Sequence, residues 1–472
     1  MNLIFSPMGK NEDRFTAGCF ILGSGLLLLF NLGLRTLENH DYLRHAEVAR
    51  EMIRTGDWVV LRLNGELYLD KLPLFFWLIG LPASAYGTVT PFLARLPSAI
   101  SAWIGVVVLF FWAKRVYRSP MIGVLSGAIL LSSYQFFLYA RAARPDMALT
   151  VLVILSLYFF HLGYEDGKES RRRALFYGLS FLFMGLLFLT KGPLAVLMPF
   201  AVMTAFLIKE KRLDLLASRP FLLGYGVMVA TILPWVFLFL SRIGFAEALL
   251  LVQENRVLTR QAPFYLYFGK IWAEFMPWSL ILPFLGAFVW RRWREVWSSR
   301  ESFFLIWFLL LFVGLTLMPY RASRYLLPLL PPLALMLGGF GKGKVKWFLI
   351  PAVLSLVVWH GVEIHWASRN LSRSPGMTLT RELNTLTGEG LLYGYRLDGS
   401  TLEELNFYLD RLTPNLKRYE EVRGALGGRK ALVLVPERLY EKMRKDRNHS
   451  VVTIGIFPYK DERLVLISGG RP

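Results

Sequence analysis

Acidic and basic side chains gather between Asp41 and Lys71, and the chemistry that they could support is the binding of an anionic group. Asp70 and Lys71 stand directly before an apolar stretch that begins at Pro73, where the chain would meet a membrane surface. A lysine at such a place can hold a phosphate, because its charge has a larger effect in a partly dry site. The same lysine can also lie along the apolar surface and place its ammonium group in water. The residues alone leave both alternatives open.

The segment 41–52 predicts an amphipathic helix. Its spacing places Arg44, Glu47 and Glu51 on related faces, and the alanine, valine and methionine residues among them supply apolar contact. Asp41 is expected to cap the N-terminus of this helix, because a carboxylate accepts hydrogen bonds from free backbone N–H groups. From spacing alone, an interfacial helix with a capping aspartate is the plainer interpretation, and a functional site is the alternative.

The elements that would position these side chains are membrane spans. Of the 472 residues, 54% are hydrophobic and 19% are charged, below the quarter that is typical of soluble domains. A net charge of +20 would suggest nucleic acid as the partner of a soluble protein, but here the basic residues stand between apolar stretches, which is the positive-inside pattern. No nucleic-acid partner is therefore expected. The apolar stretches are about as long as a membrane span and cover residues 16–35, 73–89, 94–113, 120–140, 147–164, 174–190, 193–208, 220–241, 271–290, 302–318, 325–340 and 345–361.

The basic clusters between these stretches set the predicted topology. Placing them in the cytoplasm makes the N-terminus cytoplasmic and requires that one of the early stretches does not cross. The stretch 73–89 is short and contains Pro73 and Pro82, so we expect it to lie at the outer interface or to be partly re-entrant. Eleven spans remain. The first outer loop, 36–93, the long outer loop, 242–270, and the tail after residue 361 then lie outside.

The predicted outer segments also carry basic residues that the positive-inside rule disfavours. We expect that a function requires them there, although interfacial anchoring is an alternative for the last two. They are Arg144, Lys191, Arg256, Arg260, Arg321 and Arg324.

The tail, residues 362–472, has the composition of a small soluble α/β domain. Helices are predicted over 401–412 and 437–445, and strands over 430–435, 451–457 and 463–467. The only cysteine, Cys19, lies in the first apolar stretch, so no disulfide framework within one chain is possible.

An ordered series of short motifs through the membrane part resembles the GT-C fold glycosyltransferases that use lipid-phosphate sugars, in particular the aminoarabinose transferase and protein O-mannosyltransferase-like group. Each motif is weak alone, but their order is specific. The series runs through Asp41, Arg44, Ala46-Glu47 and Ala49-Arg50-Glu51-Met52, then Gly56-Asp57-Trp58, Leu63-Asn64-Gly65-Glu66, Asp70-Lys71, Pro73-Leu74 and Trp77, then Ala94-Arg95-Leu96-Pro97-Ser98, Arg144-Pro145-Asp146, Lys191-Gly192-Pro193, Pro263-Phe264-Tyr265 and Arg324-Tyr325-Leu326-Leu327-Pro328.

The resemblance implies roles for individual residues. Asp41 matches an aspartate that acts on or near the acceptor, and Asp146 matches the aspartate of the second outer loop. Both are expected to be catalytic, although Asp146 could instead only cap the helix that follows it. Lys71 and Tyr325 match residues that contact the lipid phosphate. An arginine of the mobile outer loop 242–270 also belongs at that phosphate, and Arg256 and Arg260 are both candidates. Arg44, Glu47, Asp70 and Lys191 are expected to support the site.

The sequence departs from the family pattern at three positions. Tyr42 replaces the usual glutamate after the first aspartate, His45 replaces a tyrosine, and Asp70 replaces a glutamate. Some relatives bind a metal through that acid and a histidine of the long outer loop. The segment 242–270 contains no histidine, so metal dependence is left open and no cofactor is assigned.

These observations predict a polytopic α-helical membrane protein of the GT-C type, with a transmembrane glycosyltransferase domain over 1–361 and a soluble extracytoplasmic α/β domain over 362–472. We expect a multi-pass protein of the inner (plasma) membrane that moves a sugar from a polyprenyl-phosphate donor to a lipid, glycan or protein acceptor at the outer face. A transporter or flippase of an anionic lipid-linked substrate is the alternative, and a non-catalytic scaffold is a third class. Charged residues gather at loops rather than within spans, which favours surface chemistry over transport.

Overall fold

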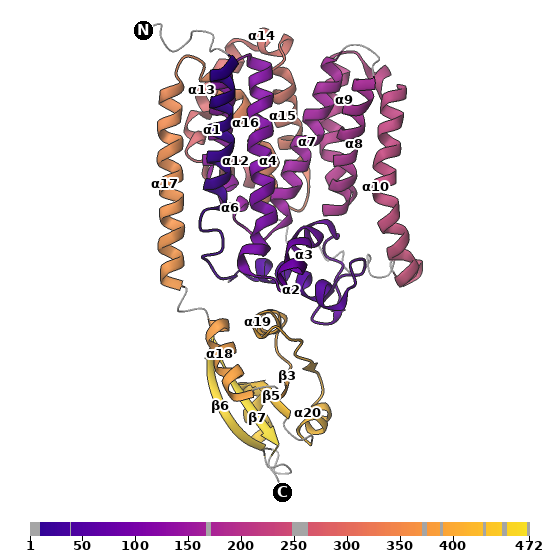
Figure 1. Ribbon diagram of the computed structural model, residues 1–472, viewed down its shortest axis with the longest axis vertical. Coiled ribbons are helices and arrows are strands. Elements are labelled where there is room, and N and C mark those ends of the chain that lie inside the picture. Colours follow the sequence, from indigo (N-terminus) through magenta and orange to yellow (C-terminus); the bar gives the residue numbers. More distant parts are fainter. Residues whose placement is uncertain are drawn as a thin grey trace. The chain divides into compact units, whose positions relative to one another are not determined.

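The computed structural model describes residues 10–37, 39–166, 171–247, 263–370, 375–387, 390–427, 431–445 and 451–469. Contacts within the chain divide it into two units, which Figure 1 shows in sequence colours. Unit 1 comprises Met1–Leu32, Leu69–Leu78 and Arg95–Glu363, and unit 2 comprises Gly33–Tyr68, Ile79–Ala94 and Ile364–Pro472. The first outer loop thus belongs largely with the tail, and the predicted domain boundary at residue 361 lies close to the division after Glu363.

Unit 1 is built of apolar helices (Figure 1). Every stretch predicted to span contains helix within the described residues. The helices are α1 (Lys10–Leu29), α4 (Pro91–Tyr117), α5 (Pro120–Ser132), α6 (Tyr134–Ala140), α7 (Pro145–Glu165), α8 (Arg171–Lys191), α9 (Pro193–Lys209), α10 (Arg219–Ile243), α12 (Leu266–Glu274), α13 (Leu282–Arg291), α14 (Trp293–Ser298), α15 (Ser302–Leu317), α16 (Leu330–Phe340) and α17 (Val345–Asn370), with short 3₁₀ helices η1 (Leu213–Ala217), η2 (Trp278–Ile281) and η3 (Ser323–Leu329).

Five helices among the described residues, α4, α7, α8, α10 and α17, are long and apolar enough to cross a membrane. Two further apolar segments are bent, by 73° between α5 and α6 and by 113° between α12 and the helical segment Trp278–Arg291, so the total rises to seven if each bent pair is one span. The exact count of eleven spans stays a prediction. The helix α3 (Leu74–Tyr86), which covers the stretch predicted to lie at the interface, has only 13 residues, fewer than the roughly 20 that a crossing needs.

Prolines fix the starts of several of these helices. Pro145 opens α7 and Pro193 opens α9, where the missing N–H is harmless and the fixed φ angle suits the first helical turn. Gly192, between α8 and α9, has a φ of 78°, which a residue with a Cβ adopts only with strain. The helices α8 and α9 can therefore follow each other with almost no connection, and Lys191 stands at this sharp corner.

Unit 2 combines the first outer loop with a five-stranded sheet. The loop forms α2 (His40–Thr55) and a small hairpin of β1 (Arg62–Leu63) and β2 (Glu66–Leu67). The sheet has the strand order β4-β3-β5-β7-β6. It contains β3 (Leu391–Tyr395), β4 (Asn415–Leu416), β5 (Ala431–Pro436), β6 (Val451–Tyr459) and β7 (Glu462–Gly469), and its helices are α18 (Pro375–Thr387), α19 (Gly399–Leu409), α20 (Tyr419–Leu426) and α21 (Glu437–Lys445).

The α/β character of the tail is confirmed, as are its three predicted strands and two predicted helices. Strand β3 pairs in parallel with β4 and β5, whereas β5, β7 and β6 pair antiparallel. Apolar side chains on the two faces of the sheet form separate cores, one around Leu434 and Leu466 and the other around Val433 and Val465. The predicted helix 401–412 ends earlier, because Asp410 adopts the left-handed conformation with a φ of 51°.

The prediction that Asp41 caps α2 is wrong. The helix begins at His40, and Asn39 is the capping residue, its side-chain oxygen accepting a hydrogen bond from the backbone N–H of Asp41 at 3.0 Å. Asp41 consequently lies inside the first turn. Its negative charge still interacts favourably there with the positive end of the helix dipole.

Candidate functional site

The buried carboxylate of Asp146 lies at the centre of a group of cations in unit 1. It is 3% exposed. The Nζ atom of Lys191 donates to its Oδ1 at 2.6 Å, and Nε of Arg144 donates to its Oδ2 at 3.1 Å. Nε of Arg324 lies 4.0 Å from Oδ1. We call these four residues together with Tyr325 the Asp146 cluster.

Three separate elements bring the Asp146 cluster together. Arg144 and Asp146 flank Pro145 at the start of α7, and Lys191 is the last residue of α8. Arg324 and Tyr325 lie in η3. The ring centre of Tyr325 is 5.1 Å from Nζ of Lys191 and 5.2 Å from Cζ of Arg324, so its face stabilises both cations.

The members of the cluster are mostly cationic. Three cationic groups face one carboxylate. Like charges held close together in a partly dry environment repel each other strongly. An anion stabilises such an arrangement. A phosphate is well suited, because its oxygens are arranged tetrahedrally and can accept hydrogen bonds from cations that approach from several directions.

Lys71 belongs to the same unit as the Asp146 cluster. Its Nζ atom contacts the Asp70 carboxylate at 2.5 Å. The next residue, Leu72, lies beside the corner that follows Lys191, since a methyl group placed on Gly192 would be 3.7 Å from its Cδ1. The two lysines are thus carried by chain segments that meet.

In unit 2, α2 carries Asp41, Arg44 and Glu47. Asp41 is half-buried in the first turn. Glu47 is fully buried and accepts two hydrogen bonds from the guanidinium group of Arg50, both at 2.7 Å. This pairing within the helix gives Glu47 a structural partner. Burial raises the pKa of the Glu47 carboxyl to about 6.

The raised pKa of Glu47 predicts that the stability of unit 2 depends on pH. The ordinary pKa is 4.5, so the folded chain holds this proton more tightly than the unfolded chain does. The resulting stabilisation is fully present below pH 4.5, and about 2 kcal/mol of it is lost as the pH rises through about 6. Thermal unfolding of the full chain between pH 4 and pH 7 measures this loss. The variant Glu47→Gln should flatten the dependence, and an unchanged slope in that variant would contradict the assignment.

The structure brings some of the predicted site residues together. Asp146, Lys191 and Tyr325 are in direct contact, and the segment of Asp70 and Lys71 approaches them. The other predicted residues, Asp41, Arg44 and Glu47, lie in unit 2. Arg256 and Arg260 lie outside the described residues.

The sequence assigned no specific role to two members of the cluster. In the sequence, Arg144 and Arg324 stand out only as basic residues of predicted outer turns; in the structure both face the carboxylate of Asp146. Arg321 instead donates to the backbone oxygen of Thr316, from Nη2 at 2.8 Å.

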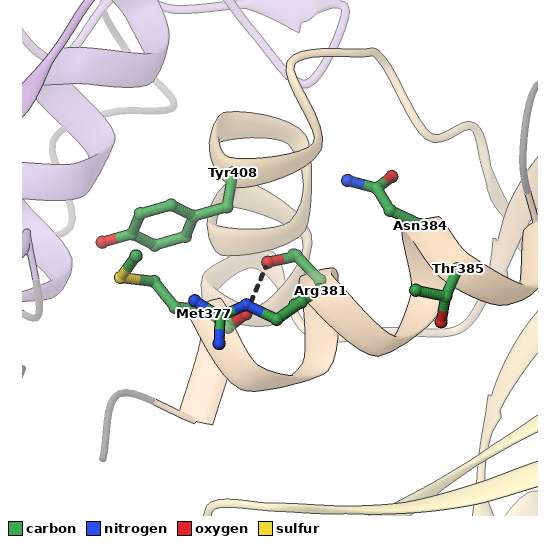
Figure 2. A pocket seen from close by; sticks show the side chains of 6 residues that line it. Met377, Arg381, Asn384, Thr385 and Tyr408 are labelled. Atoms are coloured by element: carbon green, nitrogen blue, oxygen red, sulfur yellow. Dashed lines mark hydrogen bonds between the residues drawn. The ribbon is translucent and has the colours of Figure 1, made fainter. Parts of the chain in front are cut away.

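A hollow in unit 2 is lined by none of the predicted site residues, and the described residues contain no group of candidate metal ligands. Within the described parts of the chain, histidine, cysteine, aspartate and glutamate side chains form no group of three or more that could hold a metal ion. An open hollow of about 470 Å³ lies between α18 and α19 (Figure 2). It is lined by Met377, Thr380, Arg381, Asn384, Thr385 and Tyr408.

The chain is similar to known glycosyltransferases. Residues 70–237 match the model of the dolichyl-phosphate-mannose-protein mannosyltransferase family. An undecaprenyl phosphate-alpha-4-amino-4-deoxy-L-arabinose arabinosyl transferase of Pseudomonas fluorescens is 28% identical over 357 residues, which are 73% of this chain and 64% of the relative. A transferase of the same description from Photorhabdus laumondii is 27% identical over 71% of this chain and 61% of its own length. The chain thus spans about three fifths of the length of the curated relatives that it matches.

Solved structures show the fold. The crystal structure of ArnT from Cupriavidus metallidurans bound to undecaprenyl phosphate superimposes with a TM-score of 0.75 at 19% sequence identity. The match covers 96% of this chain and 99% of that one. An archaeal oligosaccharyltransferase from Archaeoglobus fulgidus matches with a TM-score of 0.51 at 12% identity, covering 90% of this chain and 70% of that one. The predicted GT-C fold, and the resemblance to aminoarabinose and O-mannosyl transferases, are confirmed.

Proposed function

We propose that this GT-C-fold chain is a membrane glycosyltransferase, which moves a sugar from a polyprenyl-phosphate donor to a lipid, glycan or protein acceptor at the outer face of the inner membrane. The observation that carries the proposal is the Asp146 cluster, whose three cationic groups, gathered from three elements, suit a phosphate. The names of the arabinosyl transferase relatives include an undecaprenyl-phosphate-linked sugar, and the ArnT structure contains undecaprenyl phosphate. We further propose eleven spans, a cytoplasmic N-terminus and an extracytoplasmic C-terminal domain.

In the proposed reaction, a hydroxyl or amino group of the acceptor attacks the anomeric carbon of the donor sugar. The bond between that carbon and the phosphate oxygen breaks, and polyprenyl phosphate leaves with the electron pair. Lys71, Lys191 and Tyr325 stabilise the charge that develops on the phosphate, and Arg256 or Arg260 of the long outer loop adds to them. A direct displacement of this kind inverts the anomeric configuration.

The two aspartates have different parts in this proposal. Asp41 accepts the proton of the attacking group or orients the acceptor, and it is held in the first turn of a capped helix. Asp146 already binds Lys191 and Arg144, so its carboxylate has no need to act as a base. It instead positions the cations that face the donor phosphate. Without this carboxylate, their mutual repulsion would drive them apart.

Lys71 provides a direct test of phosphate binding. The variant Lys71→Met should bind undecaprenyl phosphate about 10- to 100-fold more weakly, because a hydrogen bond to a charged group contributes about 1.5–3 kcal/mol. Lys71→Arg, which keeps the charge, should lose less. Titration of the purified protein with undecaprenyl phosphate in detergent measures the affinity. Lys344→Met, at an exposed lysine before α17, is the control, and equal losses in both variants would contradict the role of Lys71.

Transfer itself distinguishes the proposed enzyme from a flippase. Purified protein in liposomes would be given undecaprenyl phosphate that carries a radiolabelled sugar, with aminoarabinose and hexoses compared, together with lipid, glycan and peptide acceptors. The proposed function predicts a labelled acceptor and free undecaprenyl phosphate. Movement of intact labelled donor across the bilayer without cleavage would instead support the flippase.

A further inference from the structure

One face of α19, in the C-terminal part of the chain, binds the first outer loop through a row of polar contacts. Glu403 and Asn406 are three residues apart in α19, so they project from the same side of the helix, and Asp410 caps its C-terminal end. Nδ2 of Asn406 donates to Oδ1 of Asn64 at 2.8 Å. Asp410 accepts from Nη1 of Arg50 at 3.1 Å. All of these residues belong to unit 2.

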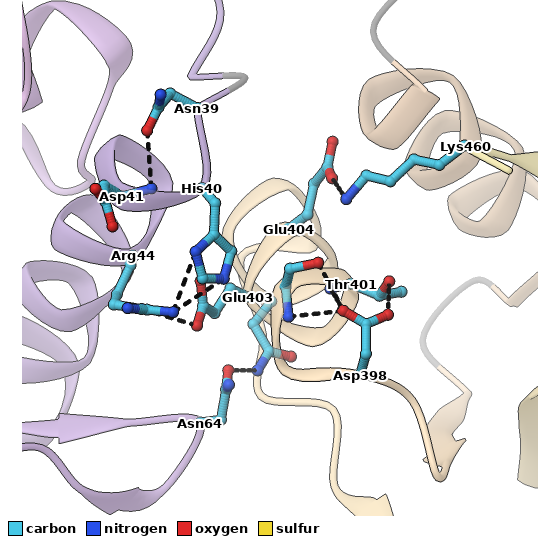
Figure 3. Close-up of polar contacts among 12 residues, drawn as sticks. Asn39, His40, Asp41, Arg44, Asn64, Asp398, Thr401, Glu403, Glu404 and Lys460 are labelled. Carbon is cyan, nitrogen blue, oxygen red and sulfur yellow. Dashed lines mark hydrogen bonds and ion pairs between the residues drawn. The ribbon is translucent and has the colours of Figure 1, made fainter. Parts of the chain in front are cut away.

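Glu403 makes the contacts nearest to the start of α2 (Figure 3). Its side chain is only 2% exposed. Its Oε1 atom accepts from Nε of Arg44 at 3.2 Å, and its Oε2 atom lies 3.2 Å from Nε2 of His40. Nη2 of Arg44 also lies 3.0 Å from Nε2 of His40, four residues earlier on the same face of α2, so the guanidinium group that Glu403 binds contacts the first residue of the helix.

The first turn of α2 is the part of the helix that most needs such support. Helix ends lack part of the internal hydrogen bonding and therefore fray. Asn39 caps the helix from its own end, and Glu403 adds an anchor from a segment far away in the sequence. Asp41 follows His40 directly, about 100° around the helix axis. The direction of its carboxylate depends on the orientation of that turn.

We propose that Glu403 is a positioning residue for sugar transfer, acting through His40 and Arg44 on the turn that carries Asp41. This inference rests on the proposed function, because it assigns Glu403 to that reaction. It gives the C-terminal domain a part in catalysis, namely to keep the first outer loop in the orientation that Asp41 requires. Glu403 itself is not proposed to contact the donor or the acceptor.

Variants of two adjacent glutamates test the proposal in the full-length protein. Glu403→Gln removes the charge that binds Arg44 and, through it, supports His40. Glu404→Gln is the matched control, because Glu404 contacts Nζ of Lys460 at 3.1 Å and Tyr459 at 2.5 Å, both within the tail. The measurements are kcat and KM for transfer of labelled sugar from its undecaprenyl-phosphate donor, the affinity for undecaprenyl phosphate, and hydrogen exchange of the amides at the start of α2.

We expect Glu403→Gln to lower kcat by about 10- to 100-fold, since misplacement of a reacting group by about 1 Å can cost about 100-fold. KM for the donor and the affinity for undecaprenyl phosphate should stay within twofold, and amide exchange at residues 41–43 should accelerate. Glu404→Gln should leave all of these values unchanged. The variant Glu403→Asp keeps the charge on a shorter side chain and should give an intermediate kcat. If Glu403→Gln fails to fold, Glu403→Asp replaces it in the test.

The outcomes separate this inference from the proposed function. If the wild type transfers sugar and Glu403→Gln transfers it with the same kcat, the positioning role is overturned while the function stands. If kcat and undecaprenyl phosphate affinity fall together with thermal stability, Glu403 is structural and the inference is also overturned. If the wild type transfers no sugar, the proposed function fails and the role of Glu403 fails with it.

Discussion

Replacing Asp41 with asparagine should lower the rate of sugar transfer by about 10²- to 10⁴-fold, the range that a general base contributes. Asparagine keeps the shape of the side chain but loses its negative charge and, with it, the ability to take up a proton. It also leaves the Asn39 cap in place, because that cap accepts a hydrogen bond from the backbone N–H of residue 41. The affinity for undecaprenyl phosphate should therefore be unchanged.

The measurement for Asp41 is transfer of labelled sugar by purified, folded protein. Asp461→Asn, in the exposed turn between β6 and β7 of the same unit, is the control and should transfer at the wild-type rate. Full activity in the Asp41→Asn variant would remove this residue from the mechanism. A loss of undecaprenyl phosphate affinity would show that Asp41 serves the donor rather than the acceptor.

Asp146→Asn should have the largest effect on stability, and it should lower transfer as well. The change leaves Arg144, Lys191 and Arg324 without the carboxylate that they face. Removal of one partner from a buried ion pair costs about 3–5 kcal/mol, because the remaining charge has no compensation. We therefore expect the Tm to fall by roughly 5–15 °C and the rate of transfer to fall about 100-fold or more.

Added undecaprenyl phosphate makes the prediction for Asp146→Asn specific. If its phosphate binds at the cluster, the lipid supplies the missing negative charge and should raise the Tm of the variant more than that of the wild type. Asp214→Asn is the matched control, since it breaks an ion pair with Arg212 on the surface and should change neither quantity. Equal stabilisation of the wild type and Asp146→Asn by the lipid would contradict phosphate binding at this place.

The sequence was most informative where long segments or ordered motifs were involved. Long apolar stretches predicted the helices of unit 1, because a span requires many consecutive apolar residues. The motif order pointed to Lys71, Asp146, Lys191 and Tyr325, and the last three are in direct contact. Basic residues in the predicted outer turns also indicated a site, and three of them, Arg144, Lys191 and Arg324, face Asp146.

Other features depend on contacts between distant parts of the chain or on local details. Glu403 lies 359 residues from Arg44, and neither segment has a sequence pattern that predicts their contact. Strand β4 has only two residues, and β3 contains Gly394, so neither shows the pattern of a strand. The predicted capping residue of α2, Asp41, lies two residues beyond the observed one, Asn39. Both residue types are good caps, and their spacing in the sequence does not distinguish them.

The central claim is that the Asp146 cluster receives the phosphate of a polyprenyl-phosphate donor. The most direct measurement is an experimental structure of the full chain with undecaprenyl phosphate bound. We predict that its phosphate lies within hydrogen-bonding distance of Lys71 or Lys191, beside the ring of Tyr325. A phosphate bound away from all three side chains would contradict the claim.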